Sequence, residues 1–220
     1  MVDNSTYLSL WGHVSMDDFL RRSERLRNQL HLSQEEVEHA IHTACDFFGI
    51  PYPAMIADLT NRQNGQTMFV NTNPTTFDDD ILCFNLRQLQ SLGVSNEGAF
   101  SLVMTHECAH RVYQRSQFGG PFNGAWAEEL ACDYYMGARA VMDQLNIQGV
   151  LNGMGKTCGS TSHPDGDLRQ NVILFGKDSA LRLLALGIPC TFENLHKEII
   201  VYLTRKGNEL ELRAQKYRSC

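Results

Sequence analysis

The stretch NEGAFSLVMTHECAHRVYQ, residues 96–114, decides the fold together with NGAWAEELACDYYMGARAVM, residues 123–142. In both segments apolar residues recur at spacings of three and four, as on one face of an amphipathic helix. The tripeptide Gly119-Gly120-Pro121 lies between them and breaks the helical pattern. The sequence therefore predicts two consecutive helices joined by a short connection.

The first of these helices contains the HExxH pattern His106-Glu107-Cys108-Ala109-His110. Histidines four residues apart lie on one face of a helix, so both imidazoles can bind the same ion. Zinc accepts imidazole and carboxylate ligands, and a catalytic zinc site has three protein ligands with a fourth position left for water. Glu107 stands next to a ligand, where it can take a proton from that water as a general base.

The second helix supplies a carboxylate for the same ion. Glu129 is placed to be the third ligand, and Asp133 follows one turn later on the same face. An acidic residue there can accept the free N–H of a ligand histidine and hold the ring in its orientation. The alternative is that Glu128 and Glu129 form a solvated helix face, and for Glu128 we prefer this interpretation.

The two patterns together resemble those of the gluzincin metallopeptidases, especially the HtpX-like and CAAX-prenyl-protease-like family. Members of that family follow HExxH with ExxAD on the next helix, and here Glu129-Leu130-Ala131-Cys132-Asp133 matches it, with Cys132 where the family usually has Ala. The resemblance assigns zinc to His106, His110 and Glu129, as the chemistry of the residues does. It implies a zincin-like fold and hydrolysis of peptide bonds.

A third element of the resemblance is Ser162-His163-Pro164 followed by Arg169. It implies that His163 hydrogen-bonds the oxyanion of the substrate and that Arg169 orients the catalytic cleft or a substrate carbonyl. Alternatively, His163 is a loop histidine that caps the next helix, and Arg169 is a surface cation. The resemblance also suggests that the strand at residues 81–85 is an edge strand that pairs with an extended substrate.

Outward from these helices, the N-terminal part of the chain predicts two further helices. Ser15 is followed by Asp18 and begins a helix that runs to about residue 30, and Ser33 with Glu36 forms a capping box for the next one. The second helix has an apolar face and stops at Gly49. Short runs typical of strands follow at residues 55–59, 67–71 and 81–85.

The C-terminal part begins with residues 146–162, which are rich in Gly, Asn, Ser and Thr and predict a loop. Helices are expected at about 165–186 and from 191 onward. The order of helices, a small sheet and helices favours an α+β fold. We expect one metallopeptidase domain over residues 1–220, with N-terminal helices in 1–50, the sheet and metal-binding helices in 51–145, and the loop and C-terminal helices in 146–220.

The composition of the chain indicates which classes of partner and which compartment to expect. The 220-residue chain has 25 acidic and 19 scattered basic residues and a net charge of −6, which does not suit a nucleic-acid partner. Seven cysteines without paired spacing indicate reduced thiols. The start of the sequence is unlike a signal peptide, and its apolar stretches are too short to span a bilayer. We therefore expect a soluble cytoplasmic protein with a protein or peptide substrate; the sequence leaves the oligomeric state open.

Several other residues invite a functional interpretation. His39 and His42 are expected to be surface histidines, since no third ligand is near them. Cys108 is expected to be a small core residue, and Cys132 is expected to pack, with a redox or alternative-ligand role as the alternative. The function predicted is that of a zinc-dependent metalloendopeptidase. A regulatory protease of the ImmA/IrrE type and a non-catalytic zinc-binding module remain as alternatives.

Overall fold

The part of the chain that can be described lies mostly in the middle and at the C-terminal end. The helix expected from Ser15 onward falls outside it apart from Leu30, and so does the Gly119-Gly120-Pro121 connection. The first two residues of the strand expected at 67–71 also fall outside. The computed structural model describes residues 30, 32–58, 69–71, 77, 80–113 and 125–218.

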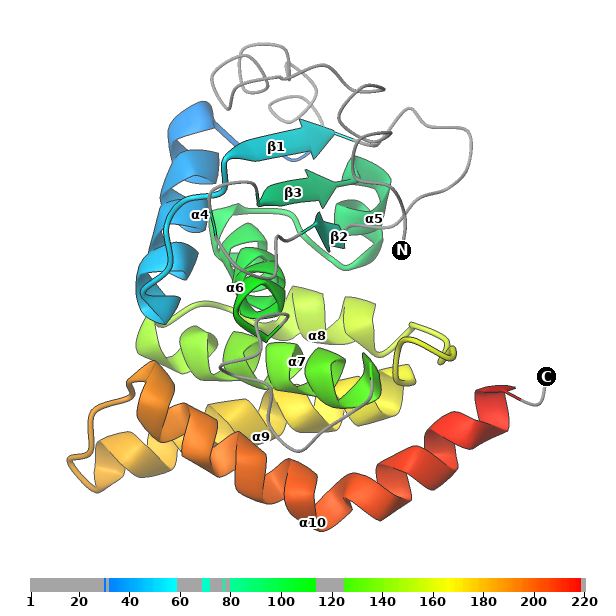
Figure 1. The fold of residues 1–220 in the computed structure, drawn as a ribbon. Coiled ribbons are helices and arrows are strands. Elements are labelled where there is room, and N and C mark those ends of the chain that lie inside the picture. Colours follow the sequence, from blue (N-terminus) through cyan, green and yellow to red (C-terminus); the bar gives the residue numbers. More distant parts are fainter. Residues whose placement is uncertain are drawn as a thin grey trace.

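Helices dominate the described residues (Figure 1). The helices are α4 (Gln34–Phe48), α5 (Leu86–Ser91), α6 (Glu97–Tyr113), α7 (Ala125–Met142), α8 (Gln148–Met154), α9 (Gly166–Ala185) and α10 (Phe192–Arg218). The strands are β1 (Met55–Asp58), β2 (Phe69–Asn71) and β3 (Ile81–Phe84).

The expected α+β, zincin-like fold class is wrong, because the protein is mostly helical. The strands are three or four residues long, whereas α7, α9 and α10 have 18, 20 and 27 residues. Between Ala54 and Asn85 the strand-like pattern lasts only a few residues before turn-forming residues interrupt it. From Glu97 to the C-terminus the helical period recurs in long segments, so helices form most of the core.

The three strands form one small sheet in the order β1-β3-β2. β1 runs parallel to β3, with Ala57 opposite Cys83, and β2 runs antiparallel to β3, with Phe69 opposite Cys83. In Figure 1 the sheet lies beside α4 and at the upper end of α6. β3 is thus the central strand, with both edges paired inside the sheet. The suggestion that it is an edge strand for an extended substrate is therefore wrong.

The helix α4 begins and ends as its sequence predicts. The Ser33 hydroxyl accepts a hydrogen bond from the Glu36 N–H, and the Glu36 carboxylate accepts one from the Ser33 N–H. The helix ends at Gly49, which has the left-handed conformation with φ 64°. Its apolar face packs on α6, which places α6 between α4 and α7.

The helices α7 and α9 are in close backbone contact at two glycines, where any larger residue would collide with the other helix. A Cβ atom on Gly137 would lie 1.8 Å from the carbonyl oxygen of Ile173, and one on Gly176 would lie 1.9 Å from that of Tyr134. The absence of these two side chains lets the backbones approach each other. This contact brings the first turn of α9 to the middle of α7, where the candidate site is.

Two local predictions differ from the structure. Residues 146–162 are not entirely loop, since α8 lies within them and buries Val150 and Met154. Its glycines disfavour a helix locally, but Gly153 lies directly against the backbone of Leu92, so packing stabilises the turn. The short helix α5 was not expected either. Asn85 begins it by accepting hydrogen bonds from the N–H groups of Arg87 and Gln88.

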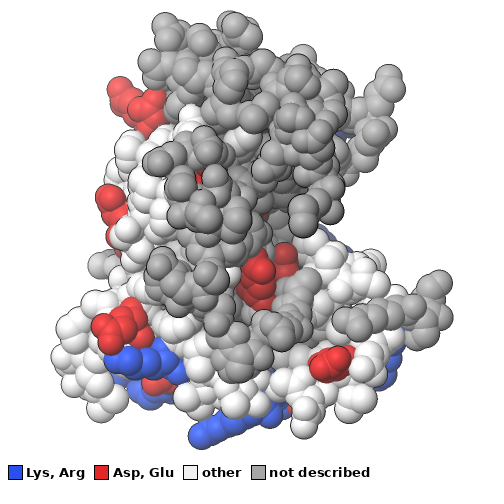
Figure 2. All heavy atoms as spheres, viewed as in Figure 1, with Lys and Arg blue, Asp and Glu red and all other residues white. Residues whose placement is uncertain are grey.

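The surface shows no single charged face in the view of Figure 2. Basic side chains there lie mainly in the lower part of the molecule and alternate with acidic ones. Among the described helices, none combines the length and the apolar character needed to cross a membrane.

Candidate metal centre

Three predicted ligands meet between α6 and α7. The Nε2 atoms of His106 and His110 are 3.2 Å apart. The Glu129 carboxylate faces both rings, with Oε2 3.5 Å from His106 Nε2 and Oε1 3.4 Å from His110 Nε2. In a tetrahedral zinc site with bonds of about 2.0–2.1 Å, neighbouring ligand atoms are separated by about 3.3 Å. The two imidazole nitrogens have this spacing, and each lies near it from a different oxygen of Glu129, so the three side chains can converge on one ion.

The state of Glu129 supports this interpretation. Its Oε2 atom is buried and accepts no hydrogen bond from the described residues. Burial by itself would raise the pKa of Glu129, but the adjacent imidazoles of His106 and His110 lower it well below 4.5. The residue is thus a buried carboxylate, and one of its oxygens has ion-pair contacts with His106 and Arg169 but accepts no hydrogen bond from the described residues. A cation bound there would satisfy that oxygen.

A buried chain of contacts holds His106. Its Nδ1 atom lies 3.0 Å from Asp133 Oδ1, so the other ring nitrogen, Nε2, faces the ligand position. Asp133 in turn accepts two hydrogen bonds from Arg169, at 2.7 Å from Nε and 2.8 Å from Nη2. Burial would raise the pKa of Asp133, but the charge of Arg169 lowers it below 3.8. The structure thus places Asp133 next to His106, the position that the sequence predicted for it.

The guanidinium of Arg169 is buried, so the alternative of a surface cation is wrong. Besides its bonds to Asp133, its Nη2 atom lies 3.6 Å from Glu129 Oε2. Arg169 comes from the first turn of α9, which the close contact with α7 brings into place. Its donors are directed at two carboxylates of the site, which suits a positioning role more than direct contact with substrate.

Sequence reasoning missed the part that Glu128 plays. Its Oε1 atom lies 2.7 Å from His110 Nδ1 at hydrogen-bond distance, whereas the contact of Asp133 with His106 Nδ1 is an ion pair without hydrogen-bond geometry. Glu128 is therefore more than a residue of a solvated helix face, although 30% of its side chain is exposed. A signal was present: two ligand histidines each need a partner for Nδ1, and two acidic residues remained beside Glu129.

Glu107, the predicted base, is also buried at the site. Burial raises its pKa above 4.5, while the neighbouring imidazoles of His106 and His110 act in the opposite direction. Its carboxylate forms no hydrogen bond or ion pair with the part of the chain that the structure describes. A carboxylate without such a partner can accept a proton from a water molecule, as a general base requires.

The loop before α9 brings His163 to the same place. Its Nε2 atom lies 3.3 Å from Glu129 Oε1, and its Nδ1 atom contacts the Ser162 hydroxyl at 2.9 Å. The loop is fixed to α7 by a hydrogen bond from Trp126 Nε1 to the Ser160 carbonyl. With 45% of its side chain exposed, His163 is the member of the cluster most open to a substrate.

Cys132 is the one sulfur near the ligands among the described residues. Its Sγ atom and one nitrogen of each of His106 and His110 all lie within 4.8 Å of one another. The side chain is fully buried, and burial raises the pKa of its thiol to about 12. Cys132 is therefore a possible ligand from α7 besides Glu129, and its thiol stays protonated unless a metal displaces the proton.

Three other candidates lie elsewhere. Cys108 is buried as expected, and its sulfur lies 3.8 Å from that of Cys45. His39 is exposed and pairs with Glu97 at 2.7 Å, while the ring of the exposed His42 packs on Tyr52. Both histidines are surface residues, as predicted.

Comparison with protein-family models, with curated proteins and with solved structures gave no match. The membership in the gluzincin metallopeptidases that the motifs suggest therefore stays a prediction, and the case for function depends on the geometry of the site.

Proposed function

We propose that this protein is a zinc-dependent peptidase that hydrolyses peptide bonds in a protein or peptide substrate. The observation that carries the proposal is the convergence of His106, His110 and Glu129, with 3.2 Å between the two Nε2 atoms and 3.4–3.5 Å from these atoms to the carboxylate, next to the buried Glu107. A site with three protein ligands and a neighbouring acid is typical of catalytic zinc.

Each residue has a distinct part in the proposed reaction. Zinc, when bound, would act as a Lewis acid and make water more acidic. Glu107 accepts a proton from the attacking water and passes it to the leaving amine, and its raised pKa brings it closer to the operating pH. His163, which is half-exposed beside Glu129, donates to the substrate oxygen on which negative charge develops.

The decisive experiment separates metal binding from catalysis. The purified protein should contain about one zinc per chain and cleave fluorogenic peptides. Glu107→Gln should keep the zinc and lose about 10²–10⁴-fold in rate, since it removes the proton acceptor and keeps the volume. Glu211→Gln, on the exposed face of α10, is the control and should match the wild type. Protein without zinc, or an active Glu107→Gln variant, would refute the proposal.

The second candidate is a non-catalytic zinc module, and the position of Cys132 favours it. A thiolate as fourth protein ligand would close the site, as in structural zinc sites. Cobalt substitution distinguishes the two. An open site should change its visible spectrum when a hydroxamate is added, whereas a closed site should show no change.

A further inference from the structure

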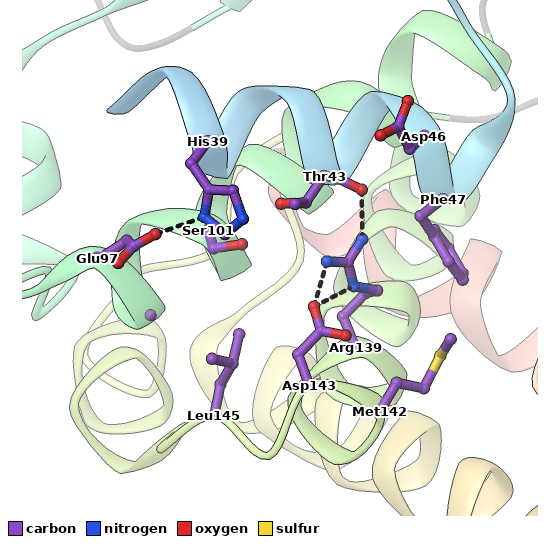
Figure 3. Close-up of a pocket in the computed structure, with 11 residues that line it drawn as sticks. His39, Thr43, Asp46, Phe47, Glu97, Ser101, Arg139, Met142, Asp143 and Leu145 are labelled. Carbon is purple, nitrogen blue, oxygen red and sulfur yellow. Dashed lines mark hydrogen bonds and ion pairs between the residues drawn. The ribbon is translucent and has the colours of Figure 1, made fainter. Parts of the chain in front are cut away.

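A second feature of the molecule lies at the other end of α6 from His106 and His110. A pocket of about 690 Å³ opens between α4, the first turns of α6 and the end of α7 (Figure 3). Sites for small molecules have volumes of about 300–1,000 Å³. None of the lining residues belongs to the metal centre, so the pocket needs an explanation of its own.

The single arginine in the pocket lining is already neutralised. Arg139 donates through Nε to Asp143 Oδ2 at 2.9 Å, with a second bond from Nη2, and through Nη1 to the Thr43 carbonyl at 2.7 Å. Its buried guanidinium also lies over the ring of Phe47, 5.3 Å from the centroid. Arg139 thus forms a fixed wall of the pocket, and its charge is balanced by Asp143.

The remaining charges of the lining are negative. Asp46 is exposed and forms no side-chain hydrogen bond or ion pair with the described residues. The Glu97 carboxylate lies 2.7 Å from His39 Nδ1 through Oε1. The two carboxylates lie toward opposite ends of the pocket in Figure 3. Because α4 rises about 1.5 Å per residue, the wall between His39 and Asp46 is about 10 Å long.

A buried polar group also faces this space. Ser101 is 7% exposed and lines the pocket, and its hydroxyl makes no hydrogen bond within the described ranges. It lies one turn after Glu97 on α6, so the two can contact one ligand group together. Between the two ends, the lining includes the half-buried apolar side chains of Met142 and Leu145.

We propose that this pocket binds a linear aliphatic amine with ammonium groups near both ends. One ammonium is held by Glu97 and Ser101, the other by Asp46, and the methylene chain packs on Met142 and Leu145. The same chemistry is found in free polyamines and in peptides with two lysines. The negative lining excludes carboxylates and phosphates.

The test is calorimetric titration of the full chain with 1,8-diaminooctane, whose two ammonium groups are about 10–11 Å apart when extended. The shorter 1,3-diaminopropane should bind more weakly, and the uncharged 1,8-octanediol should not bind. Asp46→Asn and Glu97→Gln should each weaken binding by about tenfold, the effect of losing a charged hydrogen-bond partner. Asp178→Asn, an acid on α9 outside the pocket, is the matched control.

Equal affinity for the diol would overturn the proposal, and so would equal losses in Asp178→Asn and Asp46→Asn, because attraction to the net negative charge would then suffice. Titration with the amide of Lys-Ala-Lys, compared with spermidine, identifies which of the two sources binds more tightly. Because Glu107→Gln leaves the pocket unchanged, it should bind the diamine as the wild type does. Failure of the peptidase proposal therefore does not affect this test.

Discussion

Arg169 donates two hydrogen bonds to Asp133, from Nε to Oδ2 at 2.7 Å and from Nη2 to Oδ1 at 2.8 Å. This buried pair joins α9 to α7, and through the contact of Asp133 with His106 it extends to α6. Three helices thus support one ligand of the candidate metal centre, so stability and site geometry depend on the same contacts.

Loss of Arg169 should therefore destabilise the fold. Arg169→Ala leaves the Asp133 carboxylate buried without its cation, which should reduce the free energy of unfolding by about 3–5 kcal/mol. Arg213→Ala is the control, because it breaks the more exposed pair with Asp165 and should cost about 1 kcal/mol or less. Urea unfolding followed by circular dichroism measures both. Similar losses in the two variants would contradict the central place of the Arg169–Asp133 pair.

Glu128 should contribute to metal affinity. Glu128→Ala removes the partner of His110 Nδ1, so the ring loses its fixed orientation and zinc should bind about 10–100-fold more weakly. Competition with a chromophoric chelator gives the affinity. Glu193→Ala, an exposed residue of α10, should bind zinc as the wild type does. An unchanged affinity in Glu128→Ala would restore the solvated interpretation of this residue.

Two substitutions on α7 can decide which of its residues bind zinc, Glu129 as the third ligand or Cys132 as a further one. Glu129→Ala should weaken zinc binding by more than the roughly 10–100-fold that losing a residue hydrogen-bonded to a ligand costs. Cys132→Ala should retain about one zinc per chain. X-ray absorption of the wild-type zinc form adds a direct observation. A sulfur scatterer at about 2.3 Å would show that Cys132, and not water, takes the remaining position.

The contact between α7 and α9 should not tolerate a side chain at Gly137. The added methyl of Gly137→Ala would overlap the Ile173 carbonyl, and separating the helices should cost about 1–3 kcal/mol or more. Gly207→Ala is the matched control on α10, where nothing lies within 4 Å of the added carbon. It should stabilise the protein by about 0.5–1 kcal/mol, because alanine favours a helix. The midpoint temperature of thermal unfolding should thus fall in Gly137→Ala and rise in Gly207→Ala.

His196 should make stability depend on pH. Burial lowers its pKa below 6.5, and its Nδ1 atom contacts the hydroxyls of Tyr113 and Tyr135. Well above pH 6.5 the ring is neutral in both the folded and the unfolded chain. As the pH falls below that value the unfolded chain takes the proton first, so stability declines until the pH passes the folded pKa.

His196→Gln should therefore show a smaller loss of stability than the wild type between about pH 7.5 and pH 5.5. Urea unfolding at the two pH values measures this difference for each protein. An identical loss in both would mean that His196 does not contribute to the pH dependence.

Local sequence features were sufficient to predict most of the helices. The bounds expected for α6, α7 and α9 differ from the observed ones by one or two residues, because helical period and end signals depend on near neighbours in the chain. The same signals could not predict α8, since its glycines disfavour a helix and only the contact of Gly153 with Leu92 compensates. The predicted fold class was wrong because the strands are only three or four residues long, so the long helices form most of the structure.

The sequence by itself determined that His106, Glu107 and His110 share one turn-and-a-half of a helix, because their spacing in the chain sets their positions around its axis. Only the tertiary structure decided which side chains meet them. Whether Glu128 is solvated or holds His110, and whether Arg169 is at the surface or under Asp133, depends on how α7 is rotated against α6 and how closely α9 approaches. That approach is set by two glycines far apart in the chain, and no local pattern encodes such a contact.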